Sequence, residues 1–147
     1  MLDVRLPLYD GDLEAAGVPA EVQAFRAKVL AADAVLFACP EYNFSMAAPL
    51  KNAIDWGSRA PNVWEDKPAA VMGAGGWQGT SRAQYHLRQS AVFVDMHFLN
   101  RPEVQVNAFA PGNCDATTGD LLDPSLQAKV KELVEALARW TARLRAK

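Results

Sequence analysis

The sequence predicts a single α/β domain built on a parallel β-sheet. Three observations point to this fold class: helical and strand-like segments alternate, the strand-like segments are short continuous apolar runs, and loops rich in proline or glycine follow them. Strands that are apolar throughout are typical of a parallel sheet covered by helices on both faces. The 147 residues suffice for one such domain with its own core.

The first half of the chain contains two predicted helices and one predicted strand. Residues 19–32 carry apolar side chains at helical spacing, with Pro19 suited to the first turn. Residues 34–39 form an apolar run that predicts a strand buried on both faces. Residues 40–45 then break the run as a loop, and a second helix is expected over residues 49–56.

The same order repeats in the second half. Residues 68–72 predict a strand, residues 73–79 a glycine-rich loop and residues 80–94 a helix. A third strand is expected near residues 97–99, with residues 104–106, beyond Pro102, as its candidate continuation. These alternating elements favour right-handed crossovers in one sheet.

A long helix is expected to close the chain. Asp123 is a suitable N-cap and Pro124 a suitable first residue. Its apolar face is expected to comprise Leu126, Val130, Leu133, Val134, Leu137, Trp140 and Leu144.

The opening residues are expected to be the remainder of a longer unit. Residues 2–4 look like the end of a strand, and residues 6–10 like the turn that follows it. A parallel sheet that starts at this point lacks its central partner. We therefore expect an N-terminally truncated sheet, without the first strand, the first helix and most of the second strand.

Composition favours a small-molecule ligand. The 15 Lys and Arg residues are balanced by 17 Asp and Glu residues, so no basic footprint for nucleic acid is visible. No apolar run is long enough for a membrane helix, and no signal peptide is recognisable, which predicts a cytoplasmic protein. Cys39 and Cys114 are too few for a disulfide framework or a zinc site. We expect no metal, because His86 and His97 lack nearby ligands in sequence.

The two loops after the predicted strands are the candidate site. In an open α/β sheet, ligands bind beyond the carboxyl ends of the strands, so residues 40–45 and 73–79 should lie side by side. Glycine lets the backbone come close to a ligand, and a planar cofactor would fit between such loops. Taken alone, each loop is more often a tight connection than a ligand site, and residues 73–79 match neither a dinucleotide fingerprint nor a P-loop.

Longer stretches resemble a known family. Residues 40–45, Pro-Glu-Tyr-Asn-Phe-Ser, followed by residues 49–56, closely resemble the central signature of the NADPH-dependent FMN reductase family. Residues 82–89 and 100–103 look like its chromate and quinone reductase branch. The resemblance covers nearly the whole chain.

The resemblance implies a flavodoxin-like, three-layer α/β/α fold with strand order 2-1-3-4-5 and FMN at the point where the strand order reverses. Carried over residue by residue, it implies that the flavin ring lies between the backbones of two segments. The implied FMN-binding residues are Pro40, Glu41, Tyr42, Asn43, Phe44, Ser45, Gly73, Ala74, Gly75, Gly76 and Gly79.

The chemistry implied by the resemblance is that of the cofactor. Hydride passes from NAD(P)H to the flavin, and electrons leave to quinones, chromate or similar acceptors, so we expect no indispensable catalytic side chain. A homodimer or homotetramer is implied. Trp77, Arg82, Tyr85 and Glu103 are expected in a substrate pocket or at a subunit interface.

One departure keeps alternatives open. Family members open with a strand and a loop containing Ser and Arg that binds the FMN phosphate, and no such loop is found here. Two other hypotheses therefore stand beside the reductase. One is an electron carrier of the flavodoxin type, and the other is a truncated subunit that does not retain FMN.

Overall fold

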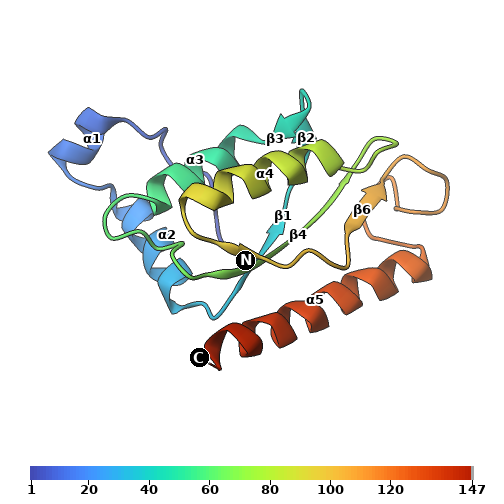
Figure 1. Ribbon diagram of the computed structural model, residues 1–147. Coiled ribbons are helices and arrows are strands. Elements are labelled where there is room, and N and C mark those ends of the chain that lie inside the picture. The colour runs from blue at the N-terminus through green and yellow to red at the C-terminus, as the bar shows by residue number, and fades with distance from the viewer. Residues whose placement is uncertain (147) are drawn as a thin grey trace.

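The computed structural model describes residues 1–146 as a sheet between two layers of helices (Figure 1). The helices are α1 (Gly11–Ala16), α2 (Ala20–Ala31), α3 (Ala48–Gly57), α4 (Ser81–Phe93) and α5 (Pro124–Arg145). The strands are β1 (Val35–Ala38), β2 (Glu41–Tyr42), β3 (Ser45–Met46), β4 (Pro68–Gly75), β5 (His97–Phe98) and β6 (Val104–Asn107). The predicted α/β class with a parallel sheet is confirmed.

The central strand of the sheet is β4. Along one edge it pairs in parallel with β1, from Val35 opposite Ala69 to Ala38 opposite Met72. Along the other edge it pairs in parallel with β5 near its start and with β6 near its end. The third predicted strand and its continuation beyond Pro102 are therefore confirmed as two pieces of one strand line.

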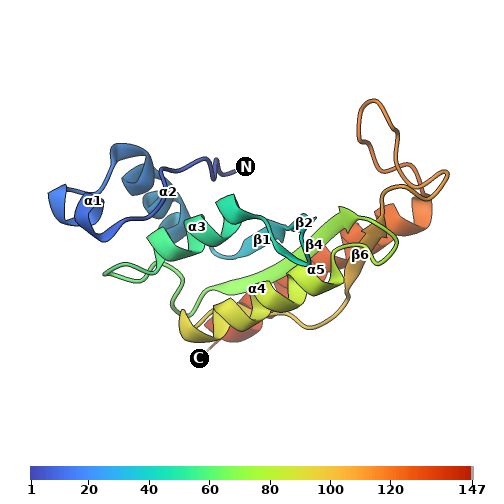
Figure 2. The ribbon, with the colours of Figure 1, turned by 90° about the horizontal axis from the view of Figure 1, so that it is seen from above.

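Side chains of β4 alternate between two apolar layers. Ala69 and Val71 pack with α2, α3 and α4, whereas Ala70 packs with Leu133 and Leu137 of α5. Figure 2 shows α3 and α4 over the strands with α5 beneath them. Because helices cover both faces of the sheet, strands β1 and β4 are apolar throughout and do not alternate between apolar and polar residues.

The predicted long helix forms as expected. The Asp123 carboxylate accepts hydrogen bonds from the N–H groups of Ser125 and Leu126, which are two of the donors that a helix start leaves unpaired. Leu133 and Leu137 are buried, but Val134 is exposed and lines a surface groove that also includes Ala34. The apolar face of α5 is thus narrower than its sequence suggests.

The glycine-rich loop is shorter than predicted. Gly73, Ala74 and Gly75, which were expected in the loop, belong to β4 and pair with Gln105, Val106 and Asn107 of β6. A neighbouring strand offers hydrogen bonds to these residues, and this pairing extends β4 despite its glycines.

The predicted loop over residues 40–45 is a tight hairpin. β2 and β3 pair in antiparallel register, with Asn43 and Phe44 between them at φ 49° and 66°. Positive φ at both central residues is the backbone that matches the twist of a two-residue hairpin.

The opening residues differ most from expectation. Residues 1–10 form no strand, although Leu2, Val4 and Leu6 pack against the core. Helix α1, which was not predicted, follows them with Asp10 as its N-cap. Among residues 1–146, no strand pairs with the outer edge of β1.

That uncovered edge changes the burial of β1. Val35 and Phe37 pack against one apolar layer and Leu36 against the other, so the strand is covered on both faces as predicted. Only Phe37 is fully buried, however, and Ala38 is exposed. Within the described chain, no helix combines the length and apolar character that a membrane span requires.

Candidate functional site

The two candidate segments leave the sheet from neighbouring strands. Ala38 lies opposite Met72, and the Cys39 N–H donates to the Met72 carbonyl at 2.9 Å. The hairpin of residues 40–46 and the loop of residues 76–80 therefore start from one edge of the sheet, at its carboxyl end. The predicted side-by-side arrangement is what the structure has.

Thr80 and the backbone of Cys39 lie close against Gly73 at this edge of the sheet. A Cβ at Gly73 would overlap the Thr80 hydroxyl and the carbonyl oxygen of Cys39. Thr80 is fully buried beneath it, and its hydroxyl oxygen accepts from the Gln84 amide at 3.0 Å. Sequence reasoning missed Thr80 as a support of the site, because a Thr before a helix normally indicates only a cap.

The tip of the hairpin holds a strained backbone. Phe44 adopts the left-handed conformation at φ 66°, which costs a residue with a Cβ about 1–2 kcal/mol. Such conformations persist where the surroundings fix them, and they gather at functional sites. The contacts that fix this one come from helix α4.

Glu41 makes the principal contact between the hairpin and α4. One carboxylate oxygen accepts from the N–H groups of Arg82 and Ala83, both at 3.1 Å, and the other accepts from Arg82 Nε at 2.6 Å. Burial raises the pKa of Glu41, but hydrogen bonds from Arg82 and Ala83 and the Arg82 charge outweigh it. The pKa therefore lies below its ordinary value, and the carboxylate is ionised at neutral pH.

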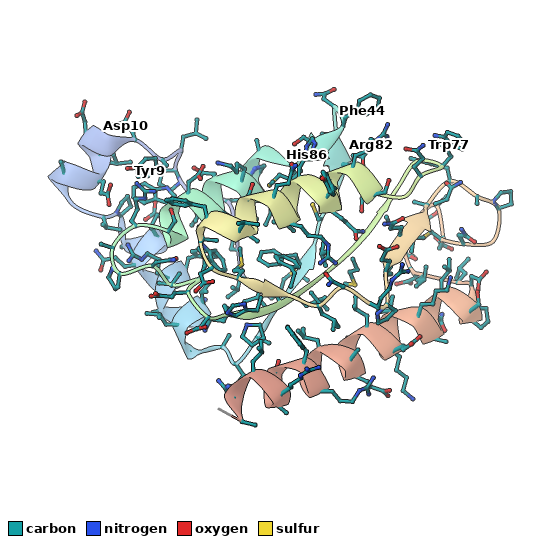
Figure 3. All side chains as sticks on the ribbon, viewed as in Figure 1. Tyr9, Asp10, Phe44, Trp77, Arg82 and His86 are labelled. Carbon is teal, nitrogen blue, oxygen red and sulfur yellow. The ribbon has the colours of Figure 1, made fainter. Side chains whose placement is uncertain are left out.

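Arg82 extends from this ion pair over the hairpin tip. Its guanidinium lies over the Phe44 ring, 3.7 Å from the ring centroid, a cation–π contact. Figure 3 shows Phe44, Arg82 and His86 grouped around the hairpin, with Trp77 on the adjacent loop. The His86 ring binds the hairpin a second time, through Nδ1 and the Ser45 hydroxyl at 3.0 Å.

The rim of the site has the features that a flat heteroaromatic ring requires. The backbone N–H groups of Asn43, Phe44, Trp77 and Gln78 donate to no acceptor within the described residues. A Cβ at Gly76 would meet nothing within 4 Å, so space is open beside this loop. Unpaired amides on both segments and open space beside the glycine loop are compatible with the isoalloxazine ring of a flavin.

Cys39 is a packing residue of this edge. Its side chain is buried, and burial together with the Glu41 charge raises the pKa of the thiol to about 11. The thiol is protonated at neutral pH, as expected for a small apolar core residue. Cys114 is half-buried.

Arg82, Tyr85 and Glu103, which were expected in a substrate pocket or at a subunit interface, form no ion pair or hydrogen bond with one another among the described residues. Arg82 binds Glu41, and Glu103 lies 3.7 Å from Arg101 instead. Tyr85 is exposed on α4. The expected place of these three residues stays a prediction.

A different polar group lies at the opposite edge of the sheet. Ligand atoms of Asp66, Asp95 and His97 lie within 4.8 Å of one another, although the sequence suggested no carboxylate near His97. The His97 ring already bonds the Asp66 carboxylate at 3.0 Å, and both aspartates are exposed. We assign no metal to these residues.

Comparison with protein families identifies the relatives of this chain. The family model described as NADPH-dependent FMN reductase matches residues 1–111, which is most of the sequence. The chain belongs to the NADPH-dependent FMN reductase family. Residues 112–147, which include helix α5, lie outside the matched part.

Individual members of the family resemble the chain over nearly its whole length. An NADPH:quinone oxidoreductase of Arabidopsis thaliana is 52% identical over 143 residues, which is 97% of this chain and 73% of that protein. An NAD(P)H-dependent FMN reductase of Pseudomonas aeruginosa is 51% identical over 142 residues, which is 95% of this chain and 76% of that protein.

A solved structure agrees with the fold. The flavoenzyme NAD(P)H:(acceptor) oxidoreductase FerB from Paracoccus denitrificans superposes with a TM-score of 0.84 and 32% identity. The match covers 97% of this chain and 79% of that one. The flavodoxin-like fold implied by the sequence is confirmed.

Proposed function

We propose that this chain is an FMN-dependent NAD(P)H oxidoreductase that reduces quinones. One observation carries the proposal. This chain belongs to the NADPH-dependent FMN reductase family, and its hairpin of residues 40–46 lies beside its loop of residues 76–80 at the carboxyl edge of the sheet. Because several relatives are named as quinone oxidoreductases, we propose quinones as the acceptors of this chain. Reduction of chromate stays a prediction.

The residues that hold the cofactor are those of the two segments. We assign the ring to the backbone of residues 40–45 on one side and residues 73–79 on the other, with the unpaired amides as donors. FMN, when bound, accepts a hydride from NAD(P)H and passes electrons to the acceptor. The chain itself binds the ring, orients it and shields it from water.

The side chains around the rim set the approach of the other substrates. Trp77 is 82% exposed on the glycine loop and offers a flat apolar surface for a nicotinamide or a quinone. We assign no acid, base or nucleophile to the protein, because the transferred hydride and electrons enter and leave through the cofactor.

We also propose one flavodoxin-like domain over residues 1–147 that assembles as a homodimer or homotetramer in the cytoplasm. Support for assembly comes from α4, where Tyr85, Val92 and Phe93 are exposed on one helical face. Apolar side chains gathered in this way are typical of a surface covered by a partner.

The activity is tested directly. Purified protein with added FMN should oxidise NADPH or NADH, and menadione should raise the rate. If neither nucleotide is oxidised while FMN is bound, the reductase assignment fails. FMN that a partner protein reduces and NAD(P)H does not would instead indicate an electron carrier.

The location of the ring is tested by filling its space. Gly76→Leu places a side chain in the open region beside the loop and should abolish FMN binding without unfolding the protein. Gly11→Leu is the matched control. A Cβ at Gly11 also meets nothing within 4 Å, but Gly11 belongs to α1 and not to the two proposed flavin-binding segments. Equal FMN affinity for the two variants and the wild type would place the ring elsewhere.

A further inference from the structure

The Glu41 side chain is buried although it belongs to an exposed hairpin. It is 7% exposed, whereas its neighbours Tyr42 and Phe44 point into solvent. A carboxylate is rarely buried unless charged groups and hydrogen-bond donors surround it. Its burial here therefore indicates a specific task for this side chain.

Glu41 provides the N-cap that α4 otherwise lacks. Thr80 occupies the N-cap position but makes no capping hydrogen bond; its hydroxyl oxygen accepts from the Gln84 amide. The first-turn N–H groups of Arg82 and Ala83 donate instead to the Glu41 carboxylate at 3.1 Å each. A negative charge at this end of the helix is also favoured by the helix dipole.

Arg82 closes the contact from the other side. Its Nε donates to the second Glu41 oxygen at 2.6 Å, and its guanidinium covers the Phe44 ring. One arginine thus neutralises the buried carboxylate and covers the hairpin turn, where Asn43 and Phe44 have positive φ. We call Glu41, Arg82 and Phe44 the clasp.

The clasp joins the two proposed flavin-binding segments. Helix α4 begins at Ser81, directly after the loop of residues 76–80, so a hairpin fixed to the start of α4 is also fixed to that loop. We propose that Glu41 is a positioning residue that sets the separation of the two segments before the cofactor binds. The nature of the ligand rests on the proposed function, but the clasp itself does not.

The first experiment measures amide hydrogen exchange on the full chain without added flavin. In Glu41→Gln the Arg82 and Ala83 amides, and the hydrogen-bonded amides of segments 41–46 and 76–80, should exchange about tenfold faster, as expected when a charge-assisted hydrogen bond is lost. Arg82→Gln keeps the capping carboxylate and should accelerate only the hairpin. Unchanged exchange in the hairpin of both variants would overturn the clasp.

Asp10→Asn is the matched control for these variants. Asp10 is another carboxylate that caps a helix, through the N–H groups of Asp12 and Leu13, and Figure 3 places it at the far end of the molecule from Arg82. Exchange should rise at α1 alone. A general loosening of the protein would instead accelerate the hairpin in this variant as well.

The second experiment measures FMN binding by fluorescence quenching and the visible circular dichroism of the bound flavin. Glu41→Gln and Arg82→Gln should each weaken binding about tenfold and change the dichroism. The double variant should lose no more than Glu41→Gln alone, because that substitution already removes the contact with the Arg82 side chain. Asp10→Asn should match the wild type.

The outcomes separate the two proposals. If the wild type and Glu41→Gln bind FMN with equal affinity and identical dichroism, the positioning role is overturned and the proposed reductase function still stands. Wild-type protein that binds no FMN would overturn the proposed function, and hydrogen exchange would then decide the clasp.

Discussion

Gly73 lies where β4 passes closest to the residues that support the site. Gly73→Ala would drive a methyl group into the Thr80 hydroxyl and the Cys39 carbonyl. Overpacking of this kind costs about 1–3 kcal/mol, so we expect that loss in the free energy of unfolding. Urea denaturation followed by circular dichroism measures it.

Gly76→Ala is the comparison for Gly73→Ala. The chemical change is the same, but the added methyl group meets nothing within 4 Å. Its effect on the free energy of unfolding should stay within about 0.5 kcal/mol. Equal losses in the two variants would show that the close packing of Gly73 does not limit stability.

The charge of Glu41 gives the second prediction at the scale of single residues. Its pKa is lowered from 4.5 in the folded protein, so its contribution to stability is present above pH 4.5 and is lost as the pH falls through the lowered value. Wild type should therefore melt at a higher temperature than Glu41→Gln at neutral pH. The difference should shrink below pH 4.5.

Differential scanning calorimetry from pH 7 downward measures this difference. The two proteins share all other acidic groups, so the comparison isolates Glu41. A gap between the two melting temperatures that is constant throughout acidification would contradict the role assigned to the ionised carboxylate.

Helix α5 packs on the sheet through only part of its predicted apolar face. Leu133 is 1% exposed and packs against Ala70 and Val104, so Leu133→Ala removes buried methyl groups and leaves a cavity. We expect a loss of about 2–5 kcal/mol in the free energy of unfolding. Thermal or urea unfolding of the two proteins measures it.

Val134, the next residue, is the control on the same helix. It is 48% exposed, so Val134→Ala should change the free energy of unfolding by no more than about 0.5 kcal/mol. A loss similar to that of Leu133→Ala would mean that Val134 is covered in solution, for instance by another subunit.

The whole molecule presents an apolar face on α4 to solvent. Phe93 is the most exposed of its large side chains, and we propose that a second copy of the chain covers it. Phe93→Glu should bury a charge in that interface and convert the dimer or tetramer into a monomer. Sedimentation velocity measures the change.

Leu8→Glu is the control for assembly. Leu8 is also an exposed apolar residue, but it belongs to the N-terminal segment. Its substitution should leave the sedimentation coefficient unchanged. If Phe93→Glu sediments as the wild type does, or if Leu8→Glu alone dissociates the protein, the assignment of the interface to α4 is wrong.

Most of the fold could be predicted from local patterns. Apolar runs and helical periodicity located α2, α3, α4, α5 and the pieces of the sheet, because these signals depend on residues near one another in the chain. Missed features depend on distant partners. The end of β4 is a strand because β6 pairs with it, and the tip of the hairpin, where Phe44 has a positive φ, is covered by Arg82 of α4.

The candidate site divides in the same way. The sequence located both segments and the glycine at position 73, since loops after parallel strands meet at one edge of a sheet. It assigned Arg82 to a substrate pocket or an interface, which stays a prediction, but it did not indicate that Arg82 pairs with Glu41. No spacing rule predicts an ion pair between residues 41 positions apart.

By itself, then, the sequence determined the order of the elements, the parallel sheet and the family, because these follow from short-range chemistry and from a long shared motif. Only the tertiary structure decided which side chain caps α4, how far β4 extends and which faces are exposed. Those features depend on which groups meet across the fold, and a buried carboxylate becomes stable only where its donors have been brought to it.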